Sequence, residues 1–250
     1  MKAKNLCWSF MIAVIMAVIS VGFVSCGDDD DDDSVSNKAI GKAPAGVVAV
    51  DLGLPSGTKW ANMNVGAEKP EDYGLYFAWG ETTGYTSDPS DGRSFDWDSY
   101  KWFNSSANTE TKYSDTVDNK TILDPEDDAA HFNWGGLWYM PTREDVRELE
   151  KNTTSKWTTV NGVYGCELTS KVEGYTDKSI FLPATGYLRG SSLYDQGSKG
   201  YFWTSTLSKD KDASFFVTCL CVNRKDDDVA TLNWARILGV TVRPVLKKQQ

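Results

Sequence analysis

Short apolar runs, each bounded by turn-forming residues, recur along the chain from residue 47 onward. Their aromatic and β-branched residues are typical of β-strands. We expect two strands in 47–67, on either side of Pro55 and Gly57, because these residues occupy the second and fourth positions of a type I turn. Further strands are expected in 74–81, 178–188, 199–207, 213–223 and 239–245. The pattern therefore predicts a domain dominated by antiparallel sheet.

Two segments have the start and stop signals of short helices. In 123–136, Asp124 can cap a helix whose first residue is Pro125, and the acidic residues that follow lie where the helix dipole favours negative charge. In 140–152, Thr142 and Asp145 form a capping box. Two short helices beside a twisted antiparallel sheet predict an α+β fold.

A long insertion separates the early strands from the helices. Residues 82–121 are rich in Ser, Asp, Asn, Thr, Tyr and Trp and have little periodicity. Insertions of this kind are usually binding surfaces or mobile loops. Because no second linker and no repeat follows, residues 47–247 are expected to form one domain.

The N-terminal segment has the pattern of an export signal. Lys2 and Lys4 precede an apolar run over 8–24, whose length of about 17 residues is at the lower limit for a membrane span. An uncleaved signal anchor is therefore the alternative. The residues up to Cys26 resemble the lipobox of bacterial lipoproteins, in which the cysteine is acylated and becomes the new N-terminus. We expect residues 1–25 to be removed as a signal peptide and Cys26 to carry palmitate or a related acyl chain.

The charge of the chain is strongly acidic. The formal net charge of −9 argues against nucleic acid as a partner, because phosphate binding needs clustered Lys and Arg. Removal of 1–25 leaves 24 basic and 35 acidic residues, a net charge of −11. The six aspartates of 28–33 repel one another, so 26–46 is expected to be a flexible tether. This run also resembles the surface-export signal of Bacteroidetes lipoproteins, which favours an outer-membrane protein facing the cell exterior over one retained in the periplasm.

Six segments, in order, resemble the Fibrobacter succinogenes major paralogous domain. They are VDLGLPSGTKWANMNVGA, PEDYGLYFAWGET, LDPEDDAAHFNWGGLWYMPTREDVRELE, SIFLPATGYLRG, GSKGYFWTSTL and GVTVRPV. The family is similar to the fold shared by C-type lectins and formylglycine-generating enzymes, in which long loops lie on a twisted sheet. The resemblance implies a C-type-lectin-like domain in which 47–52 pairs near 240–245. Some relatives are variable ligand-binding proteins of diversity-generating retroelements, with substitutions concentrated between the GYFWTS and VRPV elements.

The stretch 222–239 is the most site-like part of the chain and is expected to be a loop between strands. Trp234 offers a flat apolar face for a sugar ring or a protein, unless it packs inward. Ile237 and Leu238 are either core residues or an apolar contact patch. The candidate ligand-binding residues are Asn223, Arg224, Lys225, Asp227, Asn233, Trp234, Ile237 and Leu238.

Residues that could carry catalysis or hold a metal form no pattern typical of an enzyme. The acidic residues in 124–128 could bind calcium, but their spacing fits a helix start and lacks the glycine-containing loop of an EF-hand. His131 is the only histidine, which excludes a multi-histidine zinc site. Cys219 and Cys221 point to one face of a predicted strand, and Cys166 could form a disulfide with one of them in an oxidising compartment. We expect no metal and no cofactor.

These features predict a surface-exposed lipoprotein that is not an enzyme. Its domain is expected to bind an extracellular protein or glycan through C-terminal loops, and the resemblance allows a variable protein of a diversity-generating retroelement. Its only membrane contact would be the lipid anchor. The first alternative is a structural or accessory subunit of a surface adhesin assembly. The second is an oxidase resembling the formylglycine-generating enzymes.

Overall fold

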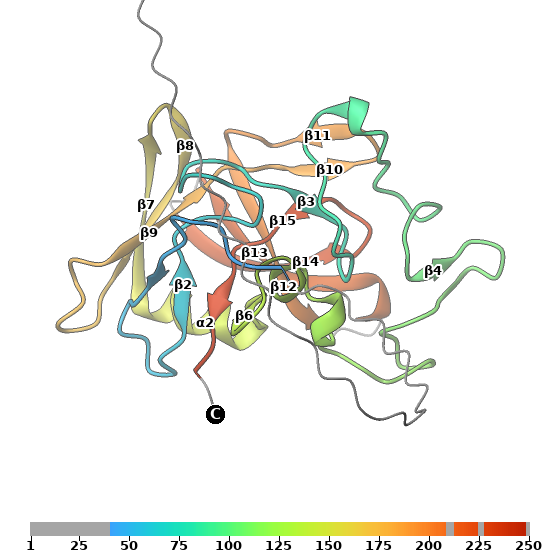
Figure 1. Ribbon diagram of the computed structural model, residues 1–250, viewed down its shortest axis with the longest axis horizontal. Helices are drawn as coiled ribbons and strands as arrows, with labels where there is room; N and C mark the ends of the chain where they lie inside the picture. Colours follow the sequence, from blue (N-terminus) through green and yellow to red (C-terminus); the bar gives the residue numbers. More distant parts are fainter. Residues whose placement is uncertain (1–40, 209–212, 225–227, 249–250) are drawn as a thin grey trace, which may run out of the picture. The chain divides into compact units, whose positions relative to one another are not determined.

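The computed structural model describes residues 41–208, 213–224 and 228–248 (Figure 1). The predicted signal peptide, Cys26 and the acidic run lie outside this part of the chain. Within the described residues, no helix is both long enough and apolar enough to cross a bilayer. Antiparallel strands dominate, with two α-helices in the described residues, so the predicted α+β class is confirmed.

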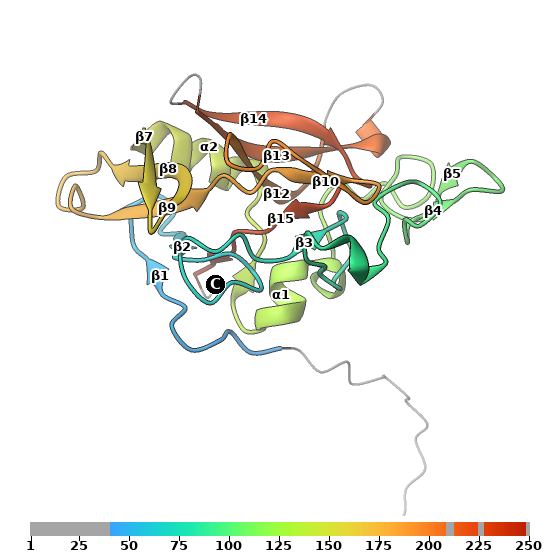
Figure 2. The same ribbon diagram turned by 90° about the horizontal axis from the view of Figure 1, so that it is seen from above.

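The largest sheet has five strands in the order β14-β13-β12-β15-β3. Their bounds are β3 Tyr76–Phe77, β12 Lys199–Leu207, β13 Phe216–Asn223, β14 Asp228–Ala235 and β15 Val240–Thr241. Strands β12, β13 and β14 form an antiparallel meander, whereas β15 pairs with β12 in parallel. Figure 2 shows β12 to β14 stacked above β15 and β3.

The two ends of the domain meet in a second sheet, ordered β1-β2-β16-β6. Its strands are β1 Ala49–Val50, β2 Lys59–Ala61, β6 Trp138–Tyr139 and β16 Val245–Leu246. The predicted hairpin is confirmed, because β1 pairs with β2 and Gly57 N donates to Leu54 O at 2.8 Å. Segments 47–52 and 240–245 do lie close together, but β2 stands between β1 and β16, so they are not direct partners.

A third sheet and two short hairpins complete the strands, and the single strand predicted over 178–188 is divided between two of them, as β9 and the start of β10. The sheet consists of β7 Thr153–Val160, β8 Val163–Ser170 and β9 Ser179–Pro183. The hairpins are β4 Phe103–Asn104 with β5 Thr109–Glu110, and β10 Tyr187–Arg189 with β11 Ser192–Tyr194. Between β7 and β8, Asn161 and Gly162 have φ of 47° and 88°, as a two-residue hairpin turn with left-handed positions requires.

Two α-helices lie in the segments where the sequence predicts them, but the first begins at a different residue from the one predicted. Helix α2, Arg143–Asn152, begins with the predicted capping box of Thr142 and Asp145. The other segment divides into a 3₁₀ turn, η2 Pro125–Asp127, and helix α1, Ala129–Trp134. Asp128 caps α1 by accepting from His131 N, whereas the side chain of Asp124 makes no cap. Two further 3₁₀ turns are η1 Pro89–Asp91 and η3 Ala213–Phe215.

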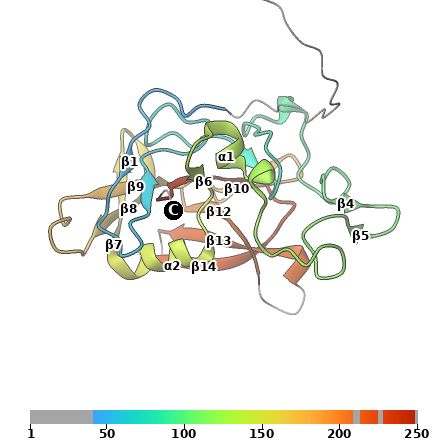
Figure 3. The same ribbon diagram turned by 60° about the horizontal axis from the view of Figure 1, so that its bottom comes forward.

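The centre of the five-stranded sheet is buried on both faces, and side-chain alternation along β13 assigns each buried residue to one core. Cys219 and Cys221 belong to the core that also contains Trp79. Leu220 and Val222 belong to the other core, with residues of α2 and β8. Because successive side chains on a strand point to opposite faces, a strand buried on both sides is a continuous apolar run. Figure 3 shows α2 lying along β13 and β14.

Candidate ligand-binding site

The predicted loop over 222–239 is instead mostly a β-hairpin. Strands β13 and β14 stay paired along their length, from Phe216 opposite Ala235 to Asn223 opposite Asp228. The candidate residues Lys225 and Asp227 lie outside the described residues.

The structure does not bring the candidate residues of this hairpin together. Asn223 and Arg224 lie at its turn, where the Arg224 guanidinium is 5.4 Å from the centre of the Tyr164 ring. Asn233 and Trp234 lie near the other end of β14. Asn233 is five residues from Asp228, a distance of about 17 Å along an extended strand. Being neighbours on one strand, they also point to opposite faces of the sheet. The prediction that these residues form a single recognition loop is therefore wrong.

Trp234 and the residues after it pack mainly inward. The Trp234 ring lies 4.5 Å, centre to centre, from both Tyr187 and Tyr201. Ile237 and Leu238 are only 8% and 7% exposed and belong to the core, so the core interpretation of these two residues is confirmed. They cannot provide a contact patch.

Cys166 lies in a different core from Cys219 and Cys221, and no disulfide joins it to either of them. Cys219 and Cys221 do point to one face, as predicted, but the main sheet separates them from Cys166. Burial raises the pKa of Cys219 well above its usual value and that of Cys221 to about 12. The predicted disulfide is therefore wrong, and thiols with raised pKa are poor nucleophiles.

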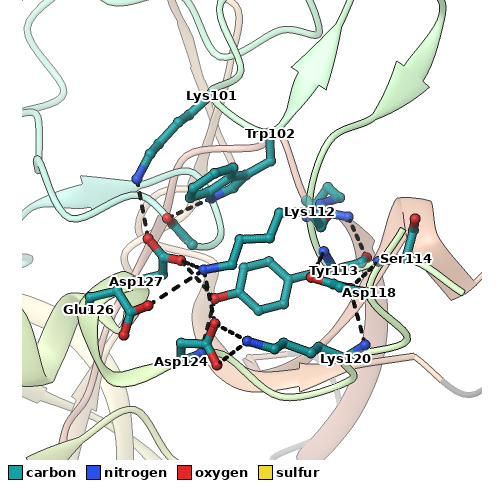
Figure 4. Close-up of polar contacts among 12 residues, drawn as sticks. Lys101, Trp102, Lys112, Tyr113, Ser114, Asp118, Lys120, Asp124, Glu126 and Asp127 are labelled. Atoms are coloured by element: carbon teal, nitrogen blue, oxygen red, sulfur yellow. Dashed lines mark hydrogen bonds and ion pairs between the residues drawn. The ribbon is translucent and has the colours of Figure 1, made fainter. Parts of the chain in front are cut away.

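The acidic residues near α1 are held by lysines (Figure 4). Carboxylate oxygens of Asp124, Glu126 and Asp127 lie within 4.8 Å of one another, as metal ligands would. Lys112 Nζ lies between them, 2.9 Å from Asp124 and 2.6 Å from Asp127. Burial lowers the pKa of Lys112, but the hydrogen bonds that Lys112 donates to these two carboxylates raise it overall. An ammonium group thus occupies the position that a metal cation would take.

Insertion 82–121 is fastened to the sheet by one buried guanidinium. Arg236, with no exposed surface, donates from Nε to Tyr100 OH at 2.7 Å. Its other nitrogens donate to the carbonyl oxygens of Lys112, Tyr113 and Ser214 at 3.1, 3.1 and 2.8 Å. Arg236 therefore joins two parts of the insertion to η3, which lies far from the insertion in the sequence.

Glu81 fixes the start of the same insertion. Arg93 Nη2 donates to both Glu81 oxygens, at 3.0 and 2.9 Å. Lys101 N donates to Glu81 Oε1 at 2.9 Å. These contacts and those of Arg236 hold a segment with little regular secondary structure in one arrangement. Side chains on its outer surface are consequently pre-positioned for a ligand.

The insertion and η3 enclose an aromatic pocket of about 280 Å³. We define the aromatic pocket by its lining residues Trp97, Asp98, Phe103, Ser105, Asn108 and Phe215. The Trp97 ring is 4.7 Å from Phe103 and 5.3 Å from Phe215, centre to centre. Three aromatic rings with polar groups at the rim are typical of a small-ligand site. Sequence reasoning missed these residues, although aromatic residues within a polar insertion were a usable signal.

A larger cavity of about 580 Å³ lies near the C-terminus, between β6 and the start of α2. Several of its polar groups are already engaged by neighbouring residues. Ser56 Oγ donates to Glu148 at 2.6 Å, Lys247 forms an ion pair with Asp145, and Met140 N donates to the carboxylate of Asp128. This cavity therefore offers less selective chemistry than the aromatic pocket.

Comparisons of the chain with protein-family models, with curated proteins and with solved structures find no match. The functional assignment therefore depends on the chemistry of the pocket and on the N-terminal sequence.

Proposed function

We propose that the mature chain is a lipid-anchored protein of the outer membrane, displayed on the cell exterior, that binds an extracellular protein or glycan in the aromatic pocket. The observation that carries this proposal is the pocket itself, in which Trp97, Phe103 and Phe215 form an aromatic lining. The N-terminal pattern up to Cys26 supports the anchored location.

Binding would use a surface that needs little reorganisation. The aromatic rings supply apolar contact area and are partly buried before any ligand arrives, so few side chains lose freedom on binding. Asp98, Ser105 and Asn108 would fix the orientation of the ligand by hydrogen bonds. The proposal includes no chemical step on the ligand, in keeping with the raised pKa values of Cys219 and Cys221.

The resemblance to the Fibrobacter succinogenes major paralogous domain fits this proposal, and with it we propose a C-type-lectin-like arrangement of the sheets. Phe215 lies between the GYFWTS and VRPV elements, the interval in which some relatives of that family vary. A variable pocket wall would suit a receptor of changing specificity. A nearby reverse transcriptase gene with a template repeat matching this interval would support a diversified receptor.

Array binding with matched variants tests the location of the site. The full mature chain in detergent micelles is applied to glycan and protein arrays. The variants Trp97→Ala and Phe215→Ala are then applied separately to the same arrays. Each variant should lose about 1 kcal/mol or more of binding to any ligand found, and circular dichroism checks that each variant remains folded. Tyr194→Ala, at an exposed ring outside the pocket, is the control. Undiminished binding by both pocket variants would place the site elsewhere.

A second candidate function is an accessory subunit of a surface adhesin assembly. It is favoured by exposed apolar side chains outside the pocket, with Tyr194 and Leu232 exposing 45% and 39% of their surfaces. Such side chains suit a protein interface more than a soluble ligand. Cross-linking on intact cells distinguishes the two functions. An assembly subunit should be cross-linked to one partner protein in stoichiometric amounts. This cross-link should be lost in Leu232→Ser and kept in Trp97→Ala.

A further inference from the structure

The aromatic pocket has the geometry of a partial cage. Trp97 contacts the other two rings, and its plane is inclined by 50° to that of Phe103 and by 85° to that of Phe215. Rings set at large angles around one hollow present faces and edges from different sides. The face of an aromatic ring carries negative potential and attracts a cation within about 6 Å of its centre.

One carboxylate lines this pocket, and a second lies beside Phe103 on the neighbouring strand. Asp98 lines it directly and is exposed to solvent. Glu110 lies opposite Phe103 in the β4–β5 hairpin, and directly opposed side chains share one face of such a pair. Oε1 of Glu110 is buried and has no hydrogen-bond partner among the described residues. A buried carboxylate oxygen without a donor is costly unless a ligand or water supplies one.

The nearby cations are already committed to other groups. Among the described residues that line the pocket there is no Lys or Arg. Lys101 and Lys112 bind Asp127, and Arg236 donates to backbone carbonyls behind the pocket. The described lining residues therefore combine aromatic faces with one negative charge, that of Asp98.

We propose that the aromatic pocket binds an organic cation, namely an alkylated ammonium group carried by the extracellular ligand. This inference rests on the proposed function and specifies the chemical class of the ligand. The rings would contact the alkyl groups of the cation and attract its charge, and Asp98 and Glu110 would balance that charge. A neutral sugar ring would use the aromatic faces equally well but would leave both carboxylates without a cationic partner.

Choline and its uncharged isostere 3,3-dimethylbutan-1-ol separate charge from shape. Their affinities for the full mature chain in polyoxyethylene detergent micelles are measured by titration calorimetry and by ligand-observed NMR. Choline should bind at least about tenfold more tightly than the isostere. Asp98→Asn should weaken choline binding about fivefold and leave the isostere unchanged. Trp97→Leu keeps an apolar side chain but removes the ring, and should weaken choline about tenfold.

The possible outcomes are distinct from those of the array experiment. Equal affinities for choline and the isostere, or no choline binding, would overturn the cation inference even if an array ligand depends on Trp97. Conversely, an array ligand that binds the Trp97 and Phe215 variants as well as wild type would refute the proposed location of binding. If Trp97→Leu proves unfolded by circular dichroism, Asp98→Asn and Glu110→Gln still decide the question, since each removes only a charge.

Discussion

At the residue scale, Asp128 is a buried carboxylate with an unusual protonation equilibrium. It accepts hydrogen bonds from His131 N at 2.9 Å and from Met140 N at 2.9 and 3.1 Å. Burial nevertheless raises its pKa from 3.8 to about 6, because desolvation outweighs these bonds. The folded protein therefore holds a proton on Asp128 at pH values where the unfolded chain has lost it. This contribution to stability is present in acid and is lost as the pH rises through about 6.

Asp128→Asn should remove this pH dependence, because an amide keeps an acceptor oxygen and never ionises. The free energy of unfolding of wild type, relative to the variant, should fall by about 1–3 kcal/mol between about pH 4 and about pH 7. Urea denaturation at both pH values measures the difference. Asp115→Asn, at an exposed aspartate, is the control and should show little change. A difference between wild type and Asp128→Asn that does not vary with pH would contradict the expectation.

Cys219 and Cys221 should be inert in the native protein. Both are buried, and a thiol whose pKa is raised by burial contains almost no reactive thiolate at neutral pH. Iodoacetamide should therefore alkylate them at least about tenfold more slowly in buffer than in urea, as measured by peptide mass spectrometry. Ser105→Cys, at the exposed rim of the aromatic pocket, should react in both solutions. Rapid native alkylation of Cys219 or Cys221 would instead favour the oxidase alternative.

At the element scale, Arg236 determines whether insertion 82–121 keeps its shape. Arg236→Lys retains a positive charge but cannot reach Tyr100, Tyr113 and Ser214 together, because an ammonium lacks the planar fork of a guanidinium. Buried carbonyl oxygens are then left without donors. We expect a loss of about 2–4 kcal/mol in the free energy of unfolding, measured in urea.

Amide hydrogen exchange provides a local readout of the same change. In Arg236→Lys, exchange should accelerate over residues 97–113 while α2 and β12 remain protected. Arg224→Lys, at an exposed arginine outside the insertion, should alter stability by less than about 0.5 kcal/mol. Uniform acceleration across the whole domain would mean that Arg236 stabilises the core generally and does not act on the insertion in particular.

Local chemistry explains which elements could be predicted from the sequence. The capping box of α2 and the turn at Pro55–Gly57 depend on residues a few positions apart, and both are confirmed. The Asn161–Gly162 turn was equally local, but the β7–β8 hairpin it joins was missed. Strand β14 was misjudged as a loop because its polar residues obscured the alternation. The aromatic pocket could not be predicted, since Phe215 meets Trp97 only through the tertiary fold.

At the scale of the whole molecule, the aromatic pocket and the entry of the chain lie on different sides of the domain. The described chain begins beside α1, where Gly41 N donates to Phe132 O at 2.8 Å and Ala43 N donates to Trp134 O at 3.0 Å. Hairpin β4–β5, whose first strand carries Phe103, projects from another side in two views (Figures 2 and 3). The first described residues therefore lie away from the hairpin that carries Phe103.

Anchoring and display are predicted from different parts of the N-terminal sequence and can be tested separately. Metabolic labelling with an alkyne fatty acid should tag wild type and Cys7→Ser but not Cys26→Ser, because only a cysteine that starts the mature chain keeps its lipid. Replacing the six aspartates of 28–33 by serine should preserve the label yet protect the domain from protease added to intact cells, since the acidic run is expected to direct export to the surface. Equal labelling of wild type and Cys26→Ser would exclude the lipid anchor. If the variant with serine at 28–33 is still cleaved by protease on intact cells, the acidic run is excluded as the export signal, whereas the lipid anchor is not.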